Sequence, residues 1–153
     1  MRIAPSQSAC FFIRVSIKFS IKDTNRSVTL QFEGNIPKGL TGYDGCHFIA
    51  RLSSLPLSAA AKVYDIRPDR WGTFFNELAE NWRGWKGVKD HESLEGHLRM
   101  EATSDSLGHI NLRISIRGVE VGDVWLAESS IGLESGQLAD VARNALAFFG
   151  VES

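Results

Sequence analysis

The sequence predicts an α+β fold, a two-layer sandwich in which a mostly antiparallel sheet of about seven strands carries two helices on one face. Two observations lead to this class. Several segments are apolar at every second position, which is typical of strands with one wet face and therefore of antiparallel sheets. Two other segments repeat apolar residues at the period of an amphipathic helix. In chain order the prediction is four strands, a helix, three strands and a helix.

The 153 residues carry a net charge of −1, and 43% of them are hydrophobic, as in ordinary single-domain proteins. We expect positions 1–8 to form a flexible tail and positions 9–150 to form one domain. The first residues do not match a signal peptide, and no apolar run reaches the roughly 20 residues of a membrane helix. Basic and acidic residues are mixed, without the basic cluster of a nucleic-acid binder. The sequence therefore predicts a cytoplasmic protein that binds neither membranes nor nucleic acid.

The first half of the chain supplies four predicted strands, at positions 11–21, 27–33, 46–52 and 57–66. The loop before the third strand, at 34–45, holds four glycines and a proline. The fourth strand combines three consecutive alanines, which favour a helix, with later residues that favour a strand. We assign this segment to a strand.

A helix is predicted to begin at Pro68 and Asp69, residue types found at helix starts, and to end at Gly84. Its apolar residues recur on one stripe, as expected for a helix packed on a sheet. They are Trp71, Phe74, Phe75, Leu78, Ala79 and Trp82.

Three more strands are predicted at positions 94–102, 110–117 and 124–133. In the first of these the predicted inward residues are Leu94, Leu98, Met100 and Ala102. The last helix is predicted at 135–149, with Ser135 as its N-cap and Gly150 at its end.

Cys10 and Cys46 both lie in apolar strand patterns and form no CxxC motif, so we expect two buried, reduced thiols, as in a reducing cytoplasm. His47 adjoins Cys46, but neighbouring strand residues point to opposite faces, which argues against shared metal ligation. No metal site and no cofactor are predicted. The motifs of serine hydrolases, P-loop proteins and dinucleotide-binding proteins are absent as well, so the sequence leans against an enzyme without excluding one.

The stretch from Trp82 to Gly87 places two tryptophans, Arg83 and two glycines at the exit of the first helix. One interpretation is a recognition patch, because Trp and Arg dominate binding hot spots. The other is structural: Trp82 completes the helix stripe, Trp85 closes the edge of the core, and the glycines shape the turn. The helical spacing favours the structural interpretation for Trp82, while both stay open for Trp85.

The histidines form no metal-binding pattern. His97 and Glu95 are predicted on one strand face, where they form either an acid–base pair or, more commonly, part of a solvated face. His109 follows a hairpin turn, which favours a turn-stabilising or surface role. The candidate binding residues are Trp82, Arg83, Trp85, Lys89, His91, Glu95, His97 and His109.

Several short motifs resemble a family of small bacterial proteins known only as a domain of unknown function. They are Trp82-Arg83-Gly84-Trp85-x-Gly87, Ser93-Leu94-Glu95-Gly96 and Gly108-His109-Ile110. The similarity runs from about position 28 to 149. It implies a shared fold and brings no catalytic residue. In size and order of elements the chain is also similar, more loosely, to immunity proteins of bacterial toxin systems.

Three hypotheses follow for function. The first is a non-enzymatic binding protein with a protein partner, with an immunity protein that blocks a bacterial toxin as its sharpest form. The second is a small-molecule pocket between sheet and helices, lined by Trp85, His91, Glu95 and His97. The third is a homodimer that associates through an exposed sheet edge or face.

Overall fold

The computed structural model describes residues 17–34, 36 and 45–150, which form two four-stranded antiparallel sheets and two helices. Each sheet pairs its strands in chain order. The strands of the first sheet are β1 (Ile17–Lys22), β2 (Thr29–Gly34), β3 (Cys46–Ser54) and β4 (Leu57–Asp65). The strands of the second sheet are β5 (Lys89–Glu92), β6 (Leu98–Ser104), β7 (His109–Glu120) and β8 (Asp123–Glu134).

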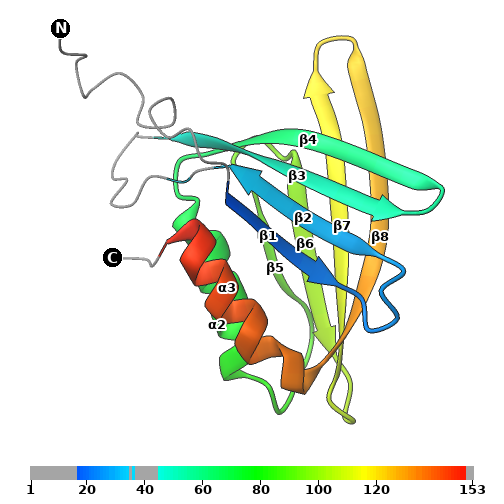
Figure 1. Ribbon diagram of the computed structural model, residues 1–153, viewed down its shortest axis with the longest axis vertical. Coiled ribbons are helices and arrows are strands. Elements are labelled where there is room, and N and C mark those ends of the chain that lie inside the picture. Colours follow the sequence, from blue (N-terminus) through cyan, green and yellow to red (C-terminus); the bar gives the residue numbers. More distant parts are fainter. Residues whose placement is uncertain (1–16, 35, 37–44, 151–153) are drawn as a thin grey trace, which may run out of the picture.

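The helices are α2 (Asp69–Glu80), which links the two sheets, and α3 (Leu138–Phe149), which follows β8 after a short 3-10 turn, η1 (Ser135–Gln137). In Figure 1 the two sheets lie one in front of the other, and α2 and α3 lie side by side next to β1 and β5. The helix pair therefore covers the side of the molecule where each sheet begins.

The α+β class, the antiparallel pairing and the predicted order of strands and helices are confirmed. The described residues hold eight strands in two sheets, where about seven strands in one sheet were expected. The additional strand is β5, whose sequence Lys-Asp-His-Glu has no apolar alternation and pairs with β6. The predicted tail at 1–8 and the predicted strand residues 11–16 lie outside the described residues.

One core joins both sheets and both helices, and its side chains are the inward residues of the alternating and helical patterns. Phenylalanine rings from the first sheet meet the end of α3, with the centroids of Phe32 and Phe149 5.1 Å apart. This aromatic cluster consists of Phe19, Phe32, Phe48, Phe148 and Phe149. Edge-to-face and tilted ring contacts thus help to hold α3 to the first sheet.

Two sequence expectations about element ends are wrong. The helix α2 ends at Glu80, because the backbone of Asn81 leaves the helical region (φ −103°, ψ 32°), so Trp82 lies beyond the helix. Before the other helix, Glu134 and not Ser135 is the N-cap, and it caps the 3-10 turn η1: the side chains of Glu134 and Gln137 satisfy each other's backbone N–H groups, forming a capping box. The helix α3 itself begins after Gln137.

A third correction concerns the strand predicted to begin at position 94. Leu94 lies in the turn between β5 and β6 and is 57% exposed, whereas the pairing with β7 begins at Leu98. Gly96 in that turn has a φ of 80°, a left-handed conformation that a strand does not contain. The alternation therefore starts four residues later than the sequence suggested.

Cys46 is buried on the inner face of β3, as predicted, but it is disulfide-bonded and not a free thiol. Cys10 lies outside the described residues. Within the described part of the chain, no helix has the length and apolar character needed to cross a membrane.

Candidate functional site

The chain from Trp82 to the first residue of β5, Lys89, exposes a tryptophan with an arginine stacked on it; we call residues 82–89 the recognition segment. Trp82 is 50% exposed, and the guanidinium carbon of Arg83 lies 5.0 Å from the centre of its ring. A cation at this distance from an indole face is attracted by the ring quadrupole. The expectation that Trp82 completes the apolar stripe of the helix is wrong, because the helix has already ended.

Trp85 anchors the recognition segment to the second sheet. Its indole N–H donates to the carbonyl oxygen of Ala102 across 3.2 Å, and its half-buried ring packs against the core. Lys89 lies at the end of the segment, with its ammonium 5.9 Å from the Trp85 ring centre and 2.9 Å from a carboxylate oxygen of Glu77 on α2. The structural interpretation of Trp85 is therefore confirmed, and these contacts hold the segment between α2 and β6.

The recognition segment carries one sign of charge. Arg83, Lys86 and Lys89 are cationic, and no acidic residue lies between positions 81 and 89. Val88, which is exposed, adds apolar area beside them. Exposed indole, guanidinium and aliphatic groups on an anchored segment are the composition of a protein-binding hot spot.

His91 lies apart from this surface, in a buried aromatic cluster at the start of α2. Its ring centre is 4.3 Å from that of Trp71, edge to face, and it also stacks with Phe74. The Trp71 indole donates to Asp65 across 3.1 Å, and the Nε2 of His91 is buried without a hydrogen-bond partner.

Burial sets the charges of this cluster. It lowers the pKa of His91 and raises the pKa of Asp65, while each group partly opposes the shift of the other. A neutral imidazole is consistent with a ring nitrogen that has no partner. The cluster therefore fixes the junction between β4, α2 and β5, and it is a structural feature of the start of the helix.

Glu95 and His97 do not share a strand face, contrary to prediction. Glu95 is exposed in the turn between β5 and β6, whereas His97 is 5% exposed directly before β6. Both influence His47 on β3: burial lowers the pKa of His47, nearby Lys62 and His97 lower it further, and Glu95 opposes them. Glu95 and His97 therefore lie at the turn between β5 and β6 and not in the recognition segment.

His109 has the turn-stabilising role that the sequence favoured. Its Nδ1 lies 2.8 Å from the carboxylate of Asp105, and its Nε2 lies 3.6 Å from that of Glu134. The hydrogen bond to Asp105 is the main reason that the pKa of His109 is raised. Asp105 also accepts the backbone N–H groups of Leu107 and His109, which closes the hairpin between β6 and β7.

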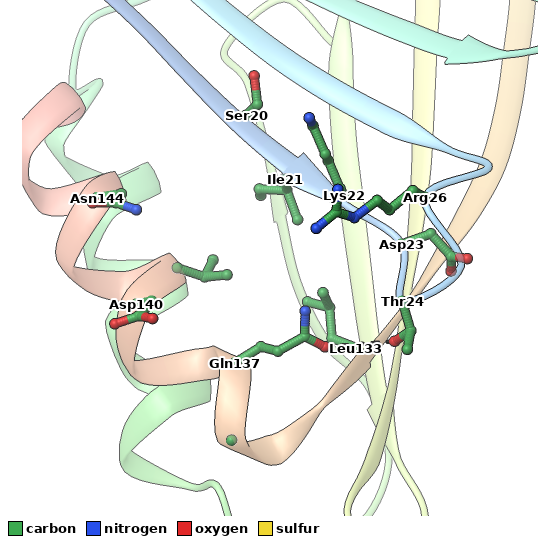
Figure 2. Close-up of a pocket in the computed structure, with 12 residues that line it drawn as sticks. Ser20, Ile21, Lys22, Asp23, Thr24, Arg26, Leu133, Gln137, Asp140 and Asn144 are labelled. Carbon is green, nitrogen blue, oxygen red and sulfur yellow. Dashed lines mark hydrogen bonds between the residues drawn. The ribbon is translucent and has the colours of Figure 1, made fainter.

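A second feature, which sequence analysis missed, is a pocket of about 470 Å³ between the turn that joins β1 to β2 and the start of α3. Figure 2 shows its polar side chains gathered from β1, the turn, η1 and α3. Its floor is apolar, formed by Ile21, Leu133 and Val141. The polar residues around it are Ser20, Lys22, Asp23, Thr24, Arg26, Gln137, Asp140 and Asn144.

A family model described as a family of unknown function (DUF6228) matches residues 21–152. The chain belongs to this family. No curated protein matches it. The matched range contains the recognition segment and every residue of the pocket lining except Ser20. Membership in this family assigns no role to any residue, so function must be argued from the two sites themselves.

Of the eight residues proposed from sequence, four lie in the recognition segment as two contacting pairs, Trp82 with Arg83 and Trp85 with Lys89. The other four, which are His91, Glu95, His97 and His109, lie in three separate places. Within the described residues no group of three His, Cys, Asp or Glu side chains is arranged to hold a metal ion. The recognition segment is therefore the candidate site that the sequence predicted in part, and the pocket is a new one.

Proposed function

We propose that this protein binds another protein through the recognition segment and has no enzymatic role of its own. The observation that carries the proposal is the exposed Trp82 with Arg83 stacked on its ring. A large side chain left half in water beyond the end of a helix gains free energy when a partner covers it. The stacked guanidinium limits the side-chain freedom of both groups, so little additional entropy is lost on binding.

The charge of the recognition segment favours an acidic partner surface. Arg83 and Lys86 extend from the segment, and Lys89 is already paired with Glu77. Neither Arg83 nor Lys86 pairs with an acidic side chain among the described residues, so acidic groups on a partner could pair with them while the partner covers Trp82. Such complementarity steers association and selects between partners.

The sharper form of this proposal is an immunity protein whose partner is a bacterial toxin. Its support is the looser similarity in size and element order, together with a one-sided basic and aromatic surface. The test is co-expression with candidate toxins encoded next to its gene. We expect growth to be rescued by the natural chain and not by the Trp82→Ala variant. Rescue by neither chain with any such toxin would overturn the toxin assignment while leaving the binding proposal to be tested separately.

The binding proposal is tested by capture from a nuclease-treated extract of the native host. Three full-length baits are compared: the natural chain, Trp82→Ala, and Leu107→Ala as the matched control. The side chain of Leu107 is 78% exposed, a larger exposed fraction than that of Trp82, but it lies in the turn between β6 and β7. We expect one protein to be retained by the natural chain and by the Leu107 variant and lost with Trp82→Ala. Equal recovery with all three baits, or no retained protein, would contradict the proposal.

We also propose a cytoplasmic location. The disulfide at Cys46 is the observation that stands against it, and it provides a direct test. Disulfides persist in oxidising compartments and are rare in a reducing cytoplasm. A cytoplasmic protein should therefore carry alkylatable cysteines when it is trapped with a thiol reagent during lysis of its host. An intact mass without alkylation would place the protein in an oxidising compartment instead.

A further inference from the structure

We propose that the pocket between the β1–β2 turn and α3 binds a small organic molecule with an oxyanion group, either a carboxylate or a phosphate, on an apolar body. The proposal is independent of the recognition segment, because the pocket uses none of its residues. Its volume of about 470 Å³ lies in the range of small-molecule sites.

The first argument is the backbone of Arg26. This residue has a φ of 58°, the left-handed region that side chains other than glycine, asparagine and aspartate rarely adopt. Its N–H donates to the carbonyl of Asp23, which closes a tight turn of the kind that normally has glycine at this position. An arginine at a glycine position is a departure from local preference that is expected at functional sites.

The second argument is the direction of the polar groups. In Figure 2 the guanidinium of Arg26 points from the turn back toward the α3 side of the pocket, and the amide nitrogen of Gln137 points toward the strands. The orientation of Gln137 is fixed, because its Oε1 accepts the backbone N–H of Glu134 across 2.8 Å. Its Nε2 is therefore the donor that remains for a ligand.

The third argument is charge. Among the described residues, neither Lys22 nor Arg26 forms an ion pair with an acidic side chain. The two carboxylates of the lining are engaged elsewhere: Asp23 accepts the backbone N–H groups of Gly132 and Asn25, and Asp140 is paired with Arg143. Two cations and an oriented amide donor above an apolar floor therefore remain for an anion.

The apolar floor distinguishes this site from one for a bare inorganic ion. Leu133 and Ile21 are buried beneath the lining, and Val141 closes the helix side. An oxyanion between Lys22 and Arg26 would leave its attached carbon groups over these side chains, where they displace water favourably. The guanidinium fork fits carboxylate and phosphate oxygens alike, so the shared chemistry is the oxyanion.

The test is a titration of the full chain, followed by backbone NMR shifts, with three probes: phenyl phosphate, benzoate and inorganic phosphate. We expect saturable shifts around Lys22, Arg26 and Gln137 with at least one of the aromatic probes and weaker binding of inorganic phosphate. The tighter of phenyl phosphate and benzoate identifies which oxyanion the site takes. No saturable shift with either aromatic probe up to about 20 mM, an affinity too weak to matter, would overturn the proposal.

Two variants make the result specific. Arg26→Gly removes the guanidinium and relieves the backbone, so it should fold at least as stably as the natural chain and bind the aromatic probe at least about tenfold more weakly. Lys18→Ala also removes one positive charge, from β1, at a residue that does not line the pocket. It should bind within about twofold of the natural chain. Equal weakening by both variants would show that general charge attracts the probe, and would contradict a built site.

Discussion

The carboxylate of Asp23 accepts the backbone N–H of Gly132 across 2.6 Å, and this bond ties the β1–β2 turn of one sheet to β8 of the other. The backbone N–H of Thr24 donates in return to the carbonyl of Gly132 across 3.0 Å. The hydrogen bond from Gly132 is the main reason that the pKa of Asp23 lies below its usual range. Two residues more than a hundred positions apart thereby set the wall of the pocket.

Replacing Asp23 by alanine removes the acceptor of the Gly132 N–H and is expected to lower the free energy of unfolding by about 1–3 kcal/mol. Ser27→Ala is the matched control, since it removes only the longer 3.3 Å bond to the same carboxylate. Urea unfolding measures both. A loss for Asp23→Ala no larger than that for Ser27→Ala would show that the bond to Gly132 does not join the sheets as described.

Trp71→Phe is expected to destabilise the fold by about 1–3 kcal/mol, because it leaves the buried carboxylate of Asp65 without the indole donor. Trp71→Phe should cost less stability in a chain that already carries Asp65→Asn. A buried neutral amide without the indole donor is less unfavourable than a buried carboxylate without it. A double-mutant cycle by chemical unfolding measures this coupling. Strictly additive losses would mean that the hydrogen bond between these two residues contributes nothing of its own.

The stability of the protein should depend on pH through the protonation of His91. Its pKa is lowered in the folded chain, so the unfolded chain takes up the proton first as the pH falls. Stability due to this residue is therefore present above the unfolded pKa of about 6.5 and is lost as the pH falls below it, until the folded pKa is passed.

The variant His91→Phe keeps an aromatic ring between Trp71 and Phe74 without a titrating group, so its stability should fall less between about pH 7.5 and pH 5. His109→Gln is the control of opposite sign, because the pKa of His109 is raised and its contribution is present at low pH and lost as the pH rises. The stability of His109→Gln should therefore fall more steeply than that of the natural chain as the pH is lowered. Identical pH profiles for His91→Phe and the natural chain would exclude a buried neutral imidazole at this position.

Gly72→Ala should destabilise the protein by about 1–3 kcal/mol, although alanine is normally the better helix residue. A Cβ at this position would lie 2.8 Å from the backbone oxygen of Gly150 and 3.2 Å from Leu146, where α2 and α3 approach each other. The exposed Ala147→Gly on α3 measures the ordinary difference between the two residues without such a contact. A melting temperature of Gly72→Ala above that of the natural chain would mean that α2 and α3 can move apart with little loss of stability.

Much of the fold could be predicted because the apolar residues of its strands and helices recur at the spacing of each element. Phe48 and Leu52 on β3, and Phe75 and Leu78 on α2, occupy the buried faces that their spacing indicated. Helix and strand ends were predicted less well. Trp82 continued the helical spacing, but the backbone of Asn81 had already ended the helix. His97 continued the alternation of β6, but pairing began only at Leu98.

The pocket could not be predicted, because it forms where segments distant in the chain meet. No local pattern places Arg26 near Gln137. Hydrogen bonds that join Asp23 and Thr24 to Gly132, and one from the Thr24 hydroxyl to the side-chain oxygen of Gln137, bring the turn against β8 and η1. The one local signal was an arginine at the turn position that favours glycine, and its φ becomes visible only in the structure. Strand β5 was missed for a similar reason, since its pairing with β6 and not its composition makes it a strand.

The most direct test of partner recognition through the recognition segment is the dissociation constant of the captured partner, measured by calorimetry for four full-length chains. These are the natural chain, Trp82→Ala, Arg83→Ala and the control Leu107→Ala. We expect Trp82→Ala to weaken binding by at least about tenfold, Arg83→Ala to weaken it measurably and Leu107→Ala to leave it unchanged. Affinities equal within about twofold for all four chains would place the binding surface elsewhere on the molecule.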